Sequence, residues 1–246
     1  AHTAAGRSPA TSNNLLAHHV SSGRLLRVRR GLFAVVPRGQ AAGTAAVDPY
    51  LLATKLTADA VIAYHAALQF HGRTYSVWRR YPYVTASRSK PFEFRGMAFV
   101  PVSPPPTLRD LPDLGGGIAT TSHEGGLVRV TTLERTLVDV LDAPQHGGDW
   151  EEIWRSLEMV EYFDLDAVIR HALALESAIT AARVGFFLEQ HREELMIDDR
   201  HLRPLRDAAP RQPRYFDPRR HAGTLLHEWN LIVPQSILLR EWGAVS

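Results

Sequence analysis

The chain has 246 residues, 45% of them hydrophobic, and its 28 basic side chains nearly balance its 26 acidic ones. This length allows one small and one larger domain around a substantial core. No run approaches the roughly 18 uninterrupted apolar residues that a membrane-spanning helix needs, so we expect no membrane partner. The absence of cysteine excludes disulfides, thiol catalysis and cysteine-ligated zinc, and it suits the reducing cytoplasm, where we expect the protein.

The start of the chain and its coding bias give two further expectations. The residues from Ala1 to Gly6 lack the charged-then-apolar pattern of a signal peptide. Because methionine is also missing there, we expect part of the native first helix to be absent. Only Lys55 and Lys90 are lysines among the 28 basic residues, an excess of arginine that is typical of GC-rich, bacterial coding. The clustering of arginines is therefore a better signal than their number.

Positive charge is concentrated near the N-terminus. Six arginines and no acidic residue precede Asp48, although the formal net charge of the whole chain is only +2. Four of these arginines lie between Gly23 and Gly31, in the stretch GRLLRVRRG. A basic segment attached to a mildly acidic remainder predicts a small domain that binds a polyanion, and nucleic acid is the obvious candidate.

A helix is predicted directly before this arginine-rich stretch. Ser8 and Pro9 form a favourable helix start, with Ser12 as an alternative N-cap. The helix should end at about Ser22, because Gly23 suits the left-handed residue that follows a helix. One face is apolar, and another has small, uncharged side chains at helical spacing, namely Asn14, Ala17, His18 and Ser21. Such a face permits close approach to the DNA major groove, where asparagine can bind adenine, and a solvated face is the alternative.

The arginine-rich stretch itself is predicted to form a β-hairpin. Leu26 and Val28 should point inward while the alternating arginines point outward, with a turn at Arg30 and Gly31 and a return strand over residues 32–36. A helix, a glycine and a basic hairpin in this order are typical of a winged helix-turn-helix, in which the wing contacts phosphates and the helix reads bases. We therefore predict a winged-helix DNA-binding domain over residues 1–46. A solvated hairpin in an arginine-rich chain is the alternative.

The predicted DNA contacts form two groups. Candidates for base or groove contacts are Asn13, Asn14, His18 and Ser21, and candidates for phosphate contacts are Arg24, Arg27, Arg29 and Arg30. A second basic run, interleaved with aromatic residues, follows in the larger domain, and its Arg79, Arg80 and Arg88 are possible additional DNA contacts. A solvated surface explains this second run equally well.

Residues 47–246 are predicted to form a mixed α+β domain whose helices cluster after residue 131. A flexible linker over residues 39–47 leads to a helix that starts at Asp48 and Pro49. Expected strands cover residues 61–63, 81–86, 92–95, 97–102, 117–122 and 127–130, with about two more near Tyr215 and Leu231. Expected helices cover residues 64–71, 132–142, 150–160, 164–173 and 178–194, and a final short helix closes the chain.

The charged residues of the helix at 132–142 have two readings. Glu134, Arg135 and Asp139 are close enough along the helix to line a catalytic cleft. The structural reading is favoured, because Thr131 and Glu134 have the spacing of a capping box and Arg135 and Asp139 can pair at i, i+4. The sequence has no HExxH, GxSxG or phosphate-binding loop motif, so we expect no catalytic residue, metal or cofactor, and no enzymatic activity.

Four segments of the sequence form a characteristic set, namely SGRLLRVRRGLFAVVP (Ser22 to Pro37), AYHAALQFHG (Ala63 to Gly72), TTLERTLVDVLDAPQHGG (Thr131 to Gly148) and WNLIVP (Trp229 to Pro234). Together they resemble AbiEi-type antitoxins, the transcriptional regulators of bacterial abortive-infection toxin–antitoxin operons. The resemblance implies a DNA-binding antitoxin of a type IV-like system that represses its own operon through an operator with inverted repeats. It also implies a cognate toxin of the nucleotidyltransferase type.

Two alternatives to this function remain open at the level of sequence. A winged helix can serve as a protein-interaction module without specific DNA binding, and a winged-helix relative of nucleases is a third reading. The oligomeric state and the residues that would neutralise a toxin are not indicated by any motif.

Overall fold

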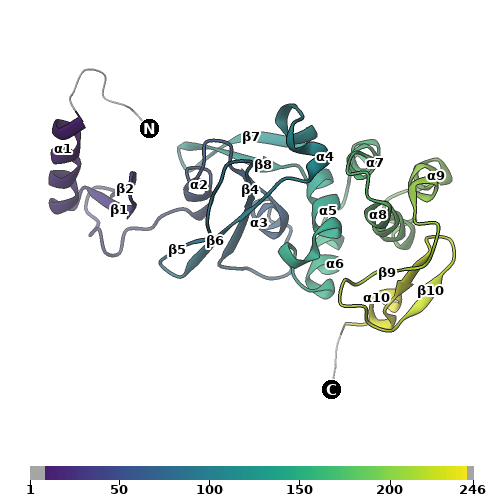
Figure 1. Cartoon of the computed structure of the whole chain (residues 1–246). Coiled ribbons are helices and arrows are strands. Elements are labelled where there is room, and N and C mark those ends of the chain that lie inside the picture. Colours follow the sequence, from purple (N-terminus) through teal and green to yellow (C-terminus); the bar gives the residue numbers. More distant parts are fainter. Residues whose placement is uncertain (1–8, 243–246) are drawn as a thin grey trace.

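A six-stranded mixed sheet lies at the centre of the protein, between a small N-terminal head and a helical C-terminal region (Figure 1). The computed structural model describes residues 9–242, and in that range it contains ten α-helices and eleven strands. The predicted mixed α+β class is therefore confirmed, and most helices follow residue 131 as expected.

The head comprises residues 9–36, with helix α1 (Pro9–Ser21) and a hairpin of β1 (Leu25–Arg29) and β2 (Leu32–Val35). Gly23 adopts φ = 70° after the helix and Gly31 adopts φ = 77° in the hairpin turn, so both glycines occupy the left-handed region as predicted. The predicted N-cap Ser8 lies outside the described residues. From Thr11 onward no residue of α1 is fully buried, so the described part of the head is an open arrangement and not a closed core.

The central sheet has the strand order β5-β6-β4-β3-β8-β7. Its strands are β3 (Val61–Ile62), β4 (Arg80–Val84), β5 (Phe92–Phe94), β6 (Met97–Val102), β7 (Ile118–His123) and β8 (Gly126–Thr131). The pairs β3–β8 and β4–β6 are parallel, and the other three pairs are antiparallel. Strand β3 is completely buried and β-branched, which is typical of a strand covered on both faces.

Short helices before and after β3 begin and end at the predicted signals. α2 (Pro49–Ala53) starts where the Asp48 carboxylate accepts a hydrogen bond from the Leu51 amide at 2.7 Å. α3 (Tyr64–Phe70) ends before Gly72, which has φ = 68°. A further short helix, α4 (Pro106–Arg109), connects β6 to β7.

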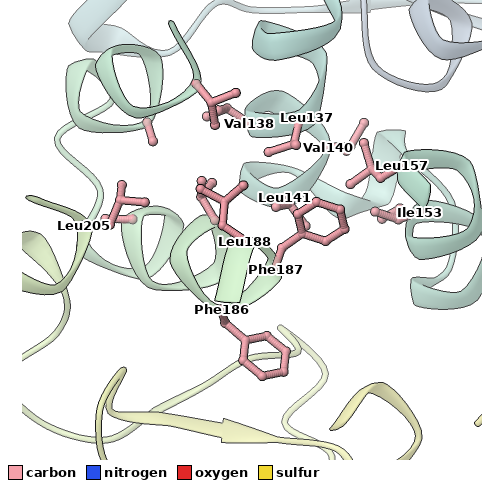
Figure 2. Packing of buried hydrophobic residues seen from close by; sticks show 14 of the residues in the cluster. Leu137, Val138, Val140, Leu141, Ile153, Leu157, Phe186, Phe187, Leu188 and Leu205 are labelled. Atoms are coloured by element: carbon pink, nitrogen blue, oxygen red, sulfur yellow. The ribbon is translucent and has the colours of Figure 1, made fainter. Parts of the chain in front are cut away.

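Two hydrophobic cores hold the body, residues 48–242, together. The smaller core joins α2 to the sheet and includes Leu52, Leu56, Ile62, Tyr83, Phe99, Val128 and Val130. The larger core lies among α5 (Leu133–Asp142), α6 (Trp150–Glu158), α7 (Leu165–Ala174), α8 (Ala178–Gln190) and α9 (Asp199–Ala208). Figure 2 shows Leu137 and Leu141 of α5 close to Phe187 and Leu188 of α8. Full burial of such a side chain contributes about 1.5–3 kcal/mol to the stability of the fold, so the helices of this region are held firmly together.

The predicted capping box at the start of α5 is wrong by one residue. Thr132 is the N-cap, and its side chain accepts a hydrogen bond from the Arg135 amide at 3.4 Å. Thr131 is the last residue of β8 and pairs with Ile118, so its backbone belongs to the sheet. The carboxylate of Glu134 accepts a bond from the Asp164 amide at 3.4 Å and therefore links α5 to the start of α7.

In the C-terminal region the predicted strands near Tyr215 and Leu231 and the predicted final short helix are confirmed, whereas one helix and one strand were not predicted. α9 was missed, and a three-stranded sheet of order β10-β11-β9 follows it. This sheet consists of β9 (Arg214–Tyr215), β10 (Thr224–Leu226) and β11 (Leu231–Val233), and the last helix is α10 (Gln235–Leu239). No helix in residues 9–242 has both the length and the apolar character required to cross a bilayer.

Candidate nucleic-acid interface

A groove of about 550 Å³ lies between α1 and the hairpin of the head. Four of the eight predicted DNA contacts line it, namely Asn13, Ser21, Arg27 and Arg30. Its apolar wall is formed by Leu16, Ala17, Val20 and Phe33. The other candidates on α1, Asn14 and His18, are exposed but outside the groove lining, so the structure does not bring all of the helix candidates to one site.

Three arginines of the head carry uncompensated charge. Arg24, Arg27 and Arg30 are exposed, and none of them forms an ion pair in the part of the chain that the structure describes. No acidic residue precedes Asp48, so the head has no carboxylate of its own to neutralise them. Exposed guanidinium groups that have no acidic neighbour attract anions, and their planar donor geometry suits phosphate.

Arg29 differs from its neighbours, because its side chain turns toward the body. Its guanidinium donates a hydrogen bond of 2.5 Å to the Leu56 carbonyl and lies 5.7 Å from the centre of the Phe92 ring. The pairing of β1 with β2 shifts register between Arg27 and Arg29, and an irregularity of this kind redirects the side chain that follows it. The prediction that Arg29 points outward with Arg27 is therefore wrong, and Arg29 instead attaches the head to the body.

The linker between head and body, residues 37–47, is also held in place. Arg95, at the turn between β5 and β6, donates hydrogen bonds to the carbonyls of Ala42 at 2.7 Å, Gly43 at 2.8 Å and Ala45 at 2.5 Å. The sequence predicted a flexible linker from its small residues, but one arginine side chain holds three backbone carbonyls of this linker in place. Arg29 and Arg95 together determine how the head is presented.

The second basic run of the sequence is partly used for internal contacts. Arg79 donates hydrogen bonds to the carbonyls of Arg95 at 2.7 Å and Gly96 at 3.2 Å, and Arg80 donates one to the Gln145 carbonyl at 3.1 Å. Only Arg88 of the three candidates is exposed without such a bond in the described range. Bonds to neutral carbonyls leave the positive charge intact but fix the direction of the guanidinium.

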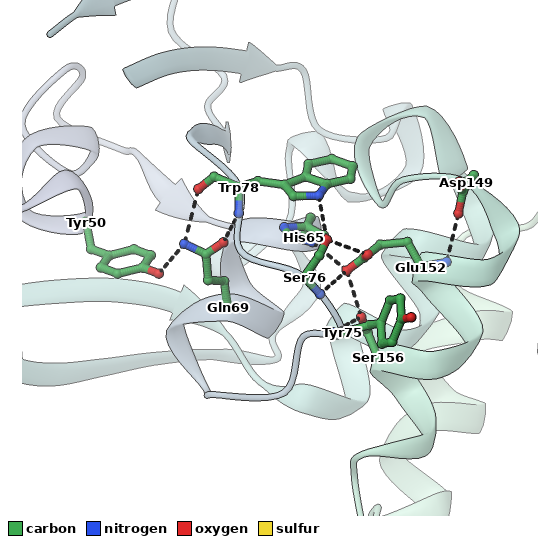
Figure 3. Close-up of polar contacts among 9 residues, drawn as sticks. All are labelled: Tyr50, His65, Gln69, Tyr75, Ser76, Trp78, Asp149, Glu152 and Ser156. Carbon is green, nitrogen blue, oxygen red and sulfur yellow. Dashed lines mark hydrogen bonds and ion pairs between the residues drawn. The ribbon is translucent and has the colours of Figure 1, made fainter. Parts of the chain in front are cut away.

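A buried polar network in the body resembles a catalytic site and was not predicted from the sequence (Figure 3). The Glu152 carboxylate on α6 lies 3.0 Å from His65 Nε2 on α3, and it accepts bonds from the Ser76 hydroxyl at 2.6 Å and the Ser76 amide at 3.0 Å. The Trp78 indole stacks on the His65 ring with centroids 3.9 Å apart, and its Nε1–H donates to the Ser76 hydroxyl at 2.9 Å.

The order of groups in this network argues for a structural role. Nucleophilic catalysis needs the base between the nucleophile and the acid, whereas here the carboxylate of Glu152 lies between Ser76 and His65. The His65 side chain is completely buried, and its Nδ1 atom has no hydrogen-bond partner among the residues that the structure describes. The network therefore joins α3, the loop before β4 and α6 into one unit.

The protonation of this network gives a testable pH dependence. Burial lowers the pKa of His65, and its hydrogen bond to Glu152 offsets this effect only in part. In the unfolded chain the imidazole has its ordinary pKa of about 6.5, so below that pH the unfolded state binds a proton that the folded state does not. The free energy of unfolding should therefore decrease as the pH falls below about 6.5. Urea titrations across this range should show a weaker pH dependence for His65→Gln, and an equal dependence would contradict the assignment.

The predicted pair on α5 is confirmed and is more deeply buried than expected. Arg135 Nε donates to Asp139 at 3.3 Å, and the exposed fractions of the two side chains are 1% and 4%. Arg135 also donates to the carbonyls of Leu114 at 3.0 Å and Gly116 at 2.6 Å. His171 Nε2 lies 3.4 Å from the other oxygen of Asp139. Arg135 thus binds the glycine-rich turn before β7 to α5, as a structural link.

Comparisons with known proteins bear on the fold. No protein-family model and no curated protein matches the chain. The fold is similar to that in the crystal structure of the Rv2827c protein from Mycobacterium tuberculosis, with a TM-score of 0.58 and 20% sequence identity. The alignment covers 96% of this chain and 83% of that chain, so it includes most of the head as well as the body. Within residues 9–242, no three His, Asp or Glu side chains are grouped so that they could hold a metal ion.

Proposed function

We propose that this protein is a DNA-binding antitoxin that represses its own operon. In this proposal α1 is the recognition helix and the hairpin is the wing of a winged helix-turn-helix, which covers residues 1–46. The observation that carries the proposal is a set of exposed arginines, Arg24, Arg27 and Arg30, that form no ion pair within the described residues. Arg27 and Arg30 line the head groove together with Asn13 and Ser21. Arginine supplies affinity for phosphate, and asparagine supplies donor and acceptor groups for a base edge.

The antitoxin part of the proposal is supported by the resemblance of four segments to AbiEi-type antitoxins. The cognate toxin would be of the nucleotidyltransferase type, and the operator would contain inverted repeats. Residues 47–246 would form the antitoxin domain. The most conspicuous of the four segments contains α5, whose residues Arg135 and Asp139 have internal, structural contacts. We therefore expect toxin recognition to use other, exposed residues of the body.

Binding to DNA from upstream of its own gene, compared with a scrambled duplex, tests this proposal. We expect the upstream duplex to bind more tightly and both affinities to fall steeply with salt, because each phosphate contact releases counterions. Equal, weak binding to both duplexes would contradict the repressor function. Gel-shift and anisotropy titrations over a range of salt concentrations provide the measurement.

The apolar wall of the head groove favours a second candidate function. Leu16, Val20 and Phe33 offer a surface on which an apolar segment of another protein could pack. In that case the head would bind a protein and not DNA. Equal, weak binding to both duplexes together with salt-insensitive binding of a protein partner would support this alternative.

A further inference from the structure

A second basic surface lies far from the head. The segment from Arg211 to His221 contains four exposed arginines (Arg211, Arg214, Arg219 and Arg220), and we call them the distal basic surface. Figure 1 shows β9, which includes Arg214, at the end of the molecule opposite to α1. None of the four arginines forms an ion pair with any residue in the described range, so their charges are uncompensated.

The backbone that carries these arginines is firmly anchored. Phe216 is completely buried and its ring contacts Trp150, Trp154 and Phe186, with centroid distances from 4.6 to 5.7 Å. The buried Arg183 guanidinium donates two hydrogen bonds to the Phe216 carbonyl, at 2.9 and 2.6 Å. A fixed backbone limits the conformational entropy lost on binding, so the backbone that carries the arginines is preorganised for a ligand.

The only acidic residue of the segment is already engaged. Asp217 is buried, accepts a hydrogen bond from the Arg219 amide at 2.8 Å, and pairs with His221 at 2.8 Å. Its carboxylate is therefore turned toward the local backbone. Beside the segment is a hollow of about 460 Å³. Its polar lining is Ser177, Arg211, Gln212 and Arg214, and its apolar lining is Ala178, Ile179 and Pro210.

The chemistry of this surface favours phosphate over a protein partner. Interfaces between proteins usually have an apolar or aromatic centre surrounded by polar residues. In this segment the largest apolar side chain, Phe216, points into the core, and Tyr215 is the one exposed aromatic residue. The apolar residues of the neighbouring hollow, Ala178, Ile179 and Pro210, are small or medium-sized and include no aromatic side chain. Arginines without an apolar centre are typical of surfaces that contact the sugar–phosphate backbone without reading sequence.

We propose that the distal basic surface binds the phosphate backbone of DNA without sequence preference, as a second contact besides the head. The inference builds on the proposed function, since the head would select the operator and the distal surface would add affinity. Because the two surfaces lie at opposite ends of the protein, one duplex reaches both only if it is long or bent. The distal surface otherwise holds a second duplex.

Paired variants of equal charge test the inference. Arg211→Gln/Arg214→Gln and Arg219→Gln/Arg220→Gln each remove two charges from the distal surface. Arg109→Gln/Arg170→Gln removes two exposed arginines elsewhere in the body that form no ion pair within residues 9–242, and it serves as the control. We expect each distal pair to bind upstream and scrambled duplexes about tenfold more weakly, and to lower the log–log salt slope by up to about 1.8. The control variant should leave both the affinity and the salt slope unchanged.

The outcomes separate this inference from the proposed function. If the distal pairs bind like the control while Arg27→Gln/Arg30→Gln weakens binding, the distal surface does not contact DNA and the head still does. Suppose that neither the unmodified protein nor any variant prefers the upstream duplex to the scrambled one, but that the distal pairs bind both duplexes more weakly than the control does. The proposed repressor function is then wrong, and the inference about the distal basic surface holds. If the distal pairs lose affinity only for an extended duplex, one duplex spans both surfaces. If they also lose affinity for a trimmed operator, the distal basic surface binds a second duplex.

Discussion

Replacing Arg27 and Arg30 together by glutamine should weaken binding to every DNA sequence and lower the log–log salt slope by about 1.8. Both guanidinium groups are exposed at the head groove, and no carboxylate in the described chain pairs with them. Each contact with a phosphate releases counterions, so two lost contacts reduce the slope by about twice 0.9. The preference for the upstream duplex over a scrambled one should change little, because phosphate contacts carry no sequence information.

Arg29→Gln is the matched control, since it removes one charge from the same strand. Arg29 binds the Leu56 carbonyl and lies over Phe92, so we expect the salt slope to stay near that of the unmodified protein. Instead, loss of the contact should loosen the head, and proteases should cleave the linker at residues 37–47 faster. If Arg29→Gln flattens the slope as much as a single substitution at Arg27, the assignment of Arg29 to the interface with the body is incorrect.

The sequence predicted features that depend on local chemistry. Glycines at positions 23, 31 and 72 end helices or form turns because they adopt positive φ, and an Asp-Pro pair starts α2. The alternation that placed Leu26 and Val28 inward is equally local, and Val28 does pack toward the smaller core. The alternation failed at Arg29, because the register shift depends on the pairing partner on β2 and on the nearby body.

Features that depend on distant residues could not be predicted. His65 on α3 and Glu152 on α6 are 87 positions apart, and only the tertiary fold brings them within 3.0 Å. The one available signal was that Glu152 shares the buried face of α6 with Ser156. α9 escaped prediction because Pro204 lies inside it and its sequence is strongly charged, although its Asp198 and His201 form a capping box.

Glu152→Ala should destabilise the protein by about 3–5 kcal/mol, the largest effect that we expect from a single substitution in the body. The carboxylate accepts hydrogen bonds from Ser76 and Ser156 and binds His65, and its side chain is 8% exposed. Burial alone would raise the pKa of Glu152, but the hydrogen bonds from Ser76 and His65 outweigh it and lower the pKa. The group is therefore ionised at neutral pH, and its loss leaves several buried donors without an acceptor.

Glu151→Ala provides a neighbouring control. Glu151 pairs with Arg155 at 2.9 Å on the same helix, but both side chains are 36% exposed, so we expect less than about 0.5 kcal/mol. Urea unfolding followed by tryptophan fluorescence measures the stability of both variants, and Trp78, which stacks on His65, is one of the five tryptophans that contribute to the signal. Equal stabilities of the two variants would contradict the structural role of the network.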